Sequence, residues 1–312
     1  MWPMNEKGVA TEQICLEDGT IKVVQVLSFR DRRHLPLVVD ALLADAPVAF
    51  HGWGVSGVCG RVDVASQFQK FWSLKQGRPP GSKIPLLEPP EEVVGHVDWD
   101  KVHPAYRYLR DPASLRKVWR GTVPFHLILP YRAEGGTLSD AVVTPAFDPD
   151  VAPHTPVPTA CFFWIDDPAL VRLVREVKST IPGVQLGVSS LNDPGQPPPF
   201  DTRDLLAYLK SRAIDRYDIV IEDPVVEPVG IASSHSQFMV PLEGEEPVWT
   251  MKRRGSVSAQ GFTRHTGFPV VGAETARVAA RQAPPERDLD AEVEECARRI
   301  RRWRLKSMFR WF

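Results

Sequence analysis

Short apolar runs alternate with amphipathic helical patterns along this chain, and this alternation constrains the fold more than any other feature. The runs typical of buried strands are VVQVL (23–27), PVAF (47–50), FHLILP (125–130), PTACFFWI (158–165), GVQLGVS (183–189) and YDIVIE (217–222). The helical patterns are LPLVVDALLAD (35–45), VASQFQKFWSLK (64–75), DPALVRLVREVKSTI (167–181) and DTRDLLAYLKSR (201–212). Strands that alternate with helices predict an α/β layer structure, and their irregular spacing leaves room for antiparallel strands.

The charge balance and the cysteines narrow the class of protein. The 312 residues carry 38 basic and 39 acidic side chains, so any preference for anions must arise from a local cluster. Cys15, Cys59, Cys161 and Cys296 lack CxxC spacing, which argues against a zinc site and a disulfide framework. No stretch approaches the roughly 20 apolar residues of a membrane helix, and no signal peptide is recognised. We therefore expect a cytoplasmic protein without a dedicated metal site.

The character of the chain changes at about residue 273, where a polar, linker-like segment begins. The residue pattern of the final segment, 291–312, predicts a helix with acidic residues first and basic residues last. This is the order that a helix dipole favours. Its apolar stripe consists of Val293, Cys296, Ile300 and Trp303. Such a helix either packs on its own domain or serves as a basic arm for RNA, an anionic surface or a partner protein.

A cationic turn, SLKQGRPPGSKIP (73–85), is the first candidate binding site. Lys75 and Arg78 lie three residues apart and would share a helix face, and Lys83 follows the Gly/Pro turn. Arginine offers a fork and lysine a point charge, a mixture common in phosphate sites. A solvated helix end is the alternative interpretation.

Two further segments hold polar residues beside apolar runs. VSSLNDPG (188–195) places Ser190 and Asn192 at the end of a strand, where α/β proteins tend to bind ligands, although an Asn-driven turn also fits. MKRRGSV (251–257) places Arg253 two residues before a glycine, in a last strand or in the loop after it.

In order and spacing, these segments resemble the motifs of the YrdC family, whose best-known members are threonylcarbamoyl-AMP synthases. KQGRP and SKIPLL are similar to the family's K-x-R-P and K-P, and WRGTVPFHLILP (119–130) is similar to its aromatic-P-G-P-L-T-L-I-L strand. SSLNDPG is similar to T-S-A-N-x-S-G, GIASSHSQFMV to S-T-I-V, and RRGSV to R-P-G. The matching residues there are Ser190, Asn192, Gly195, Arg253 and Gly255, with Ser234 and Ser236 as alternatives for the S-T-I-V serine.

The resemblance covers roughly residues 20–260 and has two clear departures. The family's PTDTVYGLG appears as HGWGVSGVC (51–59), a loop that keeps Val55 and Gly57 but loses the threonines, the acid and the tyrosine. The arginine of the family's V-R-x-P strand is replaced by Phe163 or Trp164, which substitutes an apolar or stacking surface for a cation.

The resemblance implies an α/β fold with a twisted mixed sheet, flanked by helices, and a concave basic face that binds the ligand. We therefore expect an N-terminal extension (1–20), a YrdC-like domain (21–272), and a linker with a C-terminal basic helix (273–312). The implied activity is that of a nucleotidyltransferase, which forms a carbamoyl- or acyl-adenylate from ATP, bicarbonate and an amine or amino acid, with magnesium accompanying ATP. An ordinary threonylcarbamoyl-AMP synthase and a non-catalytic nucleotide- or RNA-binding protein are the alternatives.

The resemblance also assigns roles to individual residues. Lys75 and Arg78 would be catalytic. The expected ATP contacts are Lys75, Arg78, Lys83, Ser190, Asn192, Ser236 and Arg253. The expected second-substrate pocket consists of His51, Trp53, Val55 and Ser56, where His51 is either a general base or a histidine with an ordinary hydrogen-bonding role.

Overall fold

A computed structural model describes residues 9–28, 30–52, 55–64, 66, 84–120, 123–132, 134, 138, 142–146, 157–192, 199, 201–212, 217–223, 225, 235–255, 257–272 and 289–309. Its strands are β1 (Ala10–Cys15), β2 (Ile21–Ser28), β3 (Val48–Gly52), β4 (Val55–Arg61), β5 (Leu86–Leu87), β6 (Phe125–Pro130), β7 (Thr144–Ala146), β8 (Val157–Phe163), β9 (Leu186–Ser190), β10 (Ile219–Glu222), β11 (Ser236–Met239), β12 (Trp249–Arg253) and β13 (Val270–Val271). The helices are α1 (Leu35–Leu43), α3 (Pro90–His96), η1 (Trp99–Lys101), η2 (Pro104–Arg110), α4 (Pro112–Val118), α5 (Pro168–Thr180), α6 (Thr202–Ser211), α7 (Ala259–Thr266) and α8 (Leu289–Phe309).

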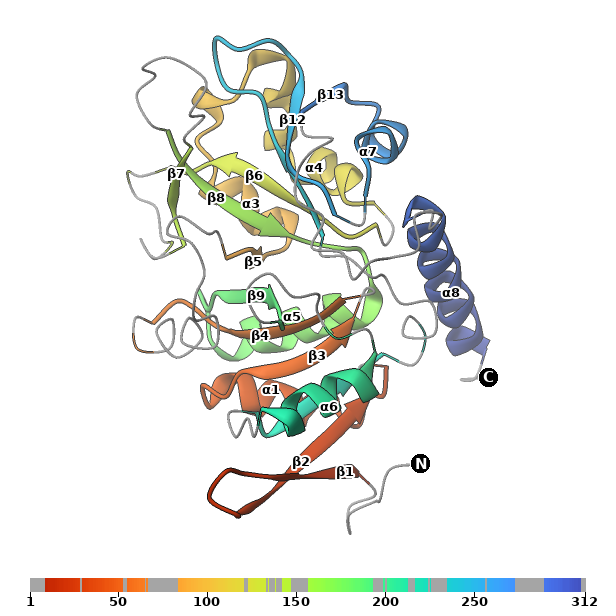
Figure 1. Ribbon diagram of the computed structural model, residues 1–312. Coiled ribbons are helices and arrows are strands. Elements are labelled where there is room, and N and C mark those ends of the chain that lie inside the picture. Colours follow the sequence, from red (N-terminus) through yellow and green to blue (C-terminus); the bar gives the residue numbers. More distant parts are fainter. Residues whose placement is uncertain are drawn as a thin grey trace.

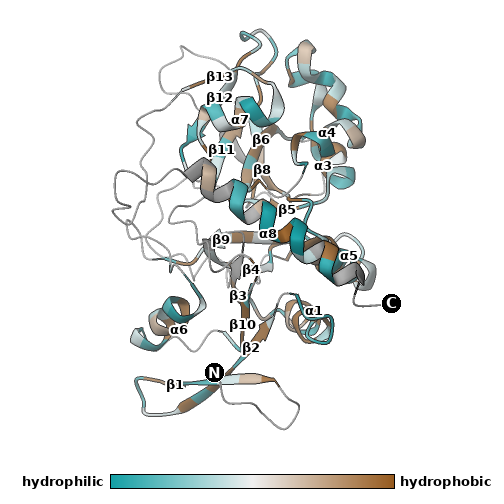
Figure 2. Cartoon of the chain, turned by 90° about the vertical axis from the view of Figure 1, so that its right-hand side faces the viewer, coloured by the Kyte–Doolittle hydropathy of each residue, from teal (hydrophilic) through white to brown (hydrophobic). Residues whose placement is uncertain are grey.

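The described strands form one mixed sheet in the order β1-β2-β10-β3-β4-β9-β5-β8-β6-β11-β12-β13, with β7 paired to β8 (Figure 1). Parallel pairs such as β2–β10 stand beside antiparallel pairs such as β3–β4. In the half of the sheet that contains β2, β10 and β3, α1 lies on one side of the strands and α6 on the other (Figure 2). The predicted fold class, a twisted mixed sheet flanked by helices, is confirmed.

All of the predicted apolar runs contain strands, namely β2, β3, β6, β8, β9 and β10. The patterns at 35–45, 167–181 and 201–212 form α1, α5 and α6, whereas the pattern at 64–75 lies largely outside the described residues. The predicted helix starts at Asp167 and Asp201 are confirmed. The Asp167 side chain accepts from the amide of Ala169 at 2.9 Å, and the Asp201 side chain accepts from the amide of Asp204 at 2.8 Å.

The expectation of a loop at 51–59 is wrong. His51 and Gly52 complete β3, and residues from Val55 onward form β4, which is antiparallel to β3 and to β9. Residues 56–60 are all buried, so this segment packs as an interior strand of the sheet, between β3 and β9. The predicted domain boundary between residues 20 and 21 falls between β1 and β2, which pair with each other.

A buried ion cluster joins the ends of three elements beneath α8. The guanidinium of Arg30, in the segment after β2, donates from Nε and Nη2 to the two carboxylate oxygens of Asp223, at 3.0 and 2.6 Å. Its Nη1 donates to Asp167 at 2.6 Å, and all three side chains are at most 4% exposed. The two carboxylates raise the pKa of Arg30 despite its burial, so this arginine remains charged.

Helix α8 packs on the domain through its apolar side. Ala297 and Ile300 are buried, and the ring of Trp303 lies 5.0 Å from the guanidinium carbon of Arg30. Arg299 donates from Nε to the carbonyl of Val225 at 2.9 Å. The interpretation of 291–312 as a packed helix is therefore supported. None of the described helices is long and apolar enough to cross a membrane.

A second buried ionic group lies where α5 packs beside β5. Nζ of Lys178 lies 2.8 Å from Glu88 and 2.7 Å from Glu92, and Glu88 is fully buried. Burial raises the pKa of Glu88 to about 8, although the attraction of Lys178 opposes this shift. At neutral pH, Glu88 is therefore mainly protonated, and Lys178 keeps its charge beside Glu92.

The Glu88→Gln variant is expected to become more stable than the wild type as the pH rises. A raised folded-state pKa gives stability that is present below the ordinary pKa of 4.5 and is lost as the pH rises through about 8. The variant should gain about 4 kcal/mol relative to the wild type between about pH 5 and about pH 9 in urea unfolding. Glu91→Gln, on the exposed start of α3, is the control and should change stability by less than about 1 kcal/mol. Parallel pH profiles for the wild type and Glu88→Gln would contradict this assignment.

Candidate functional site

A row of polar and aromatic side chains shares one face of the strands β8, β6, β11 and β12. His126 on β6 pairs with Phe163 on β8 and with Gln237 on β11, and Gln237 pairs with Arg253 on β12. Because alternate residues of a strand face opposite sides, the neighbouring apolar residues Phe125, Phe162 and Phe238 form the other face. Phe125 and Phe238 pack there against Phe262 of α7. We call the group His126, Phe163, His235 and Arg253 the His–Arg cluster.

The rings of the His–Arg cluster are in mutual contact. Phe163 is stacked on His235 with ring centroids 5.0 Å apart, and it meets His126 edge to face at 5.2 Å. The two histidine rings lie 5.3 Å apart. Of the two residues Phe163 and Trp164, Phe163 is the one whose ring contacts both histidines of this group.

Arg253 brings a positive charge into this group. Its Nε and Nη2 donate to the carbonyl of His235 at 3.2 and 2.7 Å. Among the described residues, no acidic side chain forms an ion pair with it, and burial lowers its pKa. A partly buried guanidinium that lacks a counter-charge is costly and attracts an anion.

His126 is neutral at physiological pH because burial, His235 and Arg253 together hold its pKa well below the ordinary value. The side chain is buried, and its Nδ1 has no hydrogen-bond partner among the residues that the structure describes. A neutral imidazole nitrogen can donate to or accept from a bound group without adding charge. The cluster thus combines one fixed cation with an uncharged polar ring.

Ser236 directly follows His235 and stabilises the turn after Arg253. Its hydroxyl accepts from the amides of Gly255 and Val257 at 2.8 and 3.0 Å and donates to the carbonyl of Val257. Ser236 is fully buried and uses these bonds within the protein. The structure therefore gives Ser236 a role in shaping the turn, and a direct contact with ATP stays a prediction.

The Ser236→Ala variant is expected to lose about 2–3 kcal/mol of unfolding free energy, because several buried backbone groups of the turn would lose their partner. Urea unfolding monitored by circular dichroism measures the difference. Ser211→Ala provides the control, since the Ser211 hydroxyl donates to the carbonyl of Tyr208 at an exposed helix end. Equal stabilities of the two variants would show that the turn does not depend on Ser236.

A second group of predicted residues lies where β9 ends. Ser190 pairs with Gly57 on β4, and the amide of Leu191 donates to the carbonyl of Ser56 at 3.0 Å. A side chain at Gly57 would meet the carbonyl oxygen of Ser189 at 2.7 Å, so this position requires glycine. The retained glycine of HGWGVSGVC thus allows β3, β4 and β9 to approach closely.

The strand registers relate this second group to the His–Arg cluster. Leu86 pairs with Gly187 on β9 and with Phe162 on β8, so these residues share a face. By alternation, Ser190 lies on the face of Phe163 and the cluster, whereas Ser56 lies on the opposite face and is fully buried. Strands β5, β8 and β6 separate β9 from β11.

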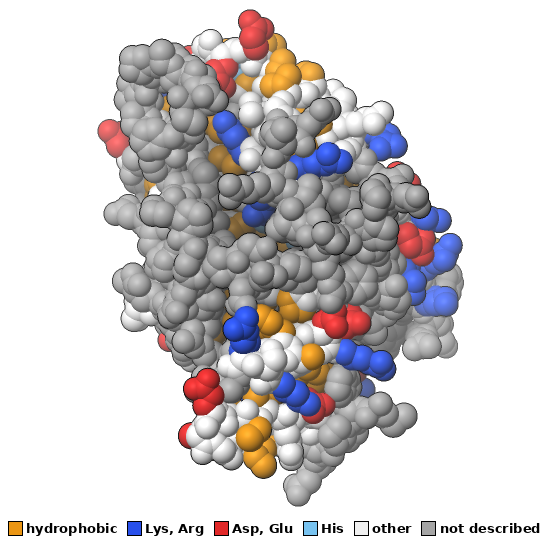
Figure 3. All heavy atoms as spheres, in the orientation of Figure 1, with side chains coloured by type: hydrophobic (Ala, Val, Ile, Leu, Met, Phe, Trp, Pro, Cys, Tyr) orange, Lys and Arg blue, Asp and Glu red, His pale blue; other side chains and the backbone are white. Residues whose placement is uncertain are grey.

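The structure thus brings Ser236 and Arg253 together and places Ser190 and Asn192 at the end of β9, several strands away. His51 and Val55 lie in β3 and β4, but their side chains are outside the described part of the chain. Lys75, Arg78, Lys83 and Trp53 lie wholly outside the described residues. In the view of Figure 3, basic and acidic side chains are interspersed over the described surface, in keeping with the net charge of −1.

His126 and His235 were not among the site residues predicted from the sequence. Each had a recognisable signal, because His126 interrupts the apolar strand FHLILP, and HSQFM alternates polar and apolar residues. Within the described residues, no group of histidine, cysteine, aspartate or glutamate side chains could hold a metal ion.

Comparison with known proteins supports the fold. No family model matches the sequence, and no curated protein matches it. Solved structures that resemble it include Sua5 from P. abyssi complexed with L-threonine (TM-score 0.55, 13% identity, 82% of this chain and 66% of that chain). They also include YciO from E. coli (0.53, 12%, 76% and 96%) and full-length HypF in a phosphate- and nucleotide-bound form (0.50, 15%, 72% and 24%). The chain therefore spans just under two thirds of the Sua5 chain, and the likeness at these identities shows the fold.

Proposed function

We propose that this protein is a nucleotidyltransferase that forms a carbamoyl- or acyl-adenylate from ATP, bicarbonate and an amine or amino acid. The fold shared with Sua5 and HypF supports an adenylate-forming activity of this kind. The altered segment 51–59 argues against threonine as the amine substrate, since the family's PTDTVYGLG is absent there.

The observation that carries the proposal is the guanidinium of Arg253. It is held by the carbonyl of His235, lacks a carboxylate among the described residues, and has a pKa that burial lowers. A phosphate group would supply the missing negative charge and could accept from the guanidinium at two oxygens. Arg253 also lies at the R-P-G position of the family, where the resemblance implies a phosphate contact.

In the proposed reaction, the amine takes up carbon dioxide, formed from bicarbonate with loss of water, and releases a proton to give a carbamate. A carbamate oxygen then attacks the α-phosphorus of ATP, the bond to the bridging oxygen breaks, and pyrophosphate leaves. Such a transfer depends on positioning and on charge stabilisation. Arg253 would stabilise the phosphates together with Lys75, Arg78 and Lys83, and Ser190 and Asn192 would anchor the nucleotide.

Magnesium would enter with ATP, as the cation of the nucleotide substrate. The described residues provide no carboxylate cage, which fits an ion held by phosphate oxygens and water. The protein's own contribution is therefore the set of cations and hydrogen-bond donors around the phosphates.

A pyrophosphate-release assay with ATP, bicarbonate and a panel of amines and amino acids tests this function. We expect release that requires both bicarbonate and one class of amine. If L-threonine is the preferred amine, the ordinary threonylcarbamoyl-AMP synthase is the correct assignment. If ATP binds but no panel member gives release, the non-catalytic nucleotide-binding protein is favoured.

A further inference from the structure

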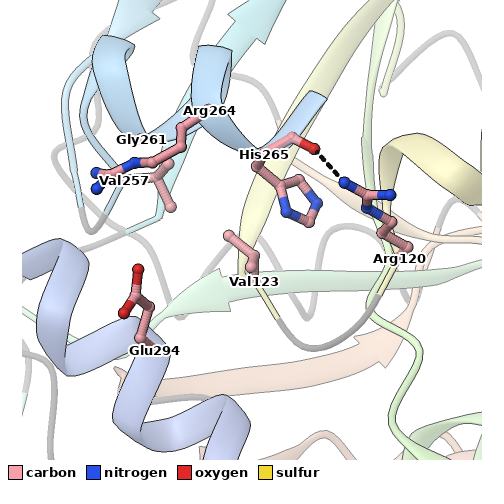
Figure 4. A pocket seen from close by; sticks show the side chains of 7 residues that line it. All are labelled: Arg120, Val123, Val257, Gly261, Arg264, His265 and Glu294. Atoms are coloured by element: carbon pink, nitrogen blue, oxygen red, sulfur yellow. Dashed lines mark hydrogen bonds between the residues drawn. The ribbon is translucent and has the colours of Figure 1, made fainter. Parts of the chain in front are cut away.

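A separate cavity of about 240 Å³ lies between α7, the start of β6 and α8. Arg264 and His265 of α7 and Glu294 of α8 line it, together with Arg120, and Val123, Val257 and Gly261 complete the wall. Figure 4 shows Glu294 reaching from α8 towards the cavity, with Arg264 on the α7 side and Arg120 beyond His265. The proposed adenylation site uses none of these residues.

The cavity lies on the opposite side of the sheet from the His–Arg cluster. His265 packs edge to face against Phe125, with ring centroids 5.9 Å apart. Phe125 and His126 are consecutive in β6, so their side chains face opposite sides of the sheet. A ligand in this cavity would therefore be distinct from a nucleotide held by Arg253.

The chemistry of the lining selects for a particular kind of ligand. Arg120, which donates to the carbonyl of His265 at 3.0 Å, and Arg264 favour a carboxylate, whereas Glu294 favours a positive charge. Nε2 of His265 lies 3.1 Å from the carbonyl of Val118 and must donate to it. In the neutral ring, Nδ1 is then an acceptor.

Ligands with only one sign of charge fit this lining poorly. A phosphate dianion would be repelled by Glu294, and a simple amine would be repelled by the two guanidinium groups. A molecule with both a carboxylate and an ammonium group would satisfy both kinds of residue, and its hydrocarbon part would contact Val123 and Val257. The volume equals that of about eight water molecules in the liquid, which suits a small amino acid.

We propose that this cavity binds a small aliphatic amino acid, with its carboxylate attracted by the arginine side chains of the lining and its ammonium group held by Glu294. Binding would connect α7 to α8, the helix whose Trp303 covers Arg30. Because α8 forms one wall, occupancy would fix α8 on the domain.

Isothermal titration calorimetry of the full chain tests this proposal with L-valine, butyrate, isobutylamine and inorganic phosphate as probes. We expect L-valine to bind at least about tenfold more tightly than each of the other probes, since each lacks one charged contact or adds a repulsion. No L-valine binding, or tighter binding of phosphate, would overturn the proposal.

Two kinds of variant then locate the binding site. Glu294→Gln should abolish the preference for L-valine over butyrate. Because Glu294 is exposed, this variant should fold like the wild type. Lys306→Gln, near the other end of α8, is the matched control and should bind L-valine like the wild type. Arg253→Gln, which removes the proposed phosphate contact, should also leave L-valine binding unchanged. Unaltered selectivity in Glu294→Gln, or loss of binding in Arg253→Gln, would place the amino acid elsewhere.

Discussion

Replacement of Arg30 by methionine is expected to lower the free energy of unfolding by about 3–5 kcal/mol. Removal of the guanidinium leaves the buried carboxylates of Asp167 and Asp223 without their counter-charge, and neither side chain has access to water. The same change removes the cation beneath the ring of Trp303 and so weakens the packing of α8 on the domain. The cost is large because three strand and helix ends meet at this one side chain.

Urea unfolding of Arg30→Met measures this effect, with Arg33→Gln as the control variant. Arg33 also pairs with an aspartate, at 2.6 Å from Asp31, but its side chain is 86% exposed. Its replacement should cost far less than that of Arg30, as for other exposed ion pairs. If the two variants have similar stabilities, the Arg30 cluster does not hold the domain together.

The Arg253→Gln variant is expected to reduce adenylate formation by about 100-fold or more, because it removes a preorganised charge from the phosphate site. Glutamine can still donate to the carbonyl of His235, so the local backbone should be retained. Initial rates of pyrophosphate release at saturating ATP measure the effect.

Arg254→Gln is the matched control, since Arg254 is the next residue and is exposed. Its rate should stay within about threefold of the wild-type rate, as expected for a distant exposed charge. A comparable loss in both variants would indicate a general electrostatic effect and would contradict a specific phosphate contact at Arg253.

Much of the fold could be predicted from the sequence, because the strands and helices that carry strong periodicity bury apolar side chains in regular patterns. FHLILP forms β6 with the predicted bounds, and Asp167 and Asp201 start their helices through the expected capping bonds. The segment 51–59 was expected to be a loop, whereas its described residues belong to β3 and β4. In the structure, Gly57 instead permits the close approach of β3 and β9.

The site was less predictable, because it depends on pairings between strands far apart in the sequence. His126, Phe163, His235 and Arg253 meet only through the order β8-β6-β11-β12, which no local pattern specifies. Arg253 was found through an ordered resemblance of motifs, and the lack of an ion-pair partner for it among the described residues became visible only from its contacts. The ionic cluster of Arg30 likewise joins residues that are 137 and 193 positions apart.

Carbamoyl-adenylate formation is tested most directly by the mass spectrum of the product formed from ATP, carbon-13 bicarbonate and the amine that best promotes pyrophosphate release. We expect an adenylate whose mass includes the amine and increases by one carbon-13 substitution, and which is nearly absent with Arg253→Gln. An adenylate that forms without the labelled carbon, or equally well with Arg253→Gln, would contradict carbamoyl-adenylate formation at this site.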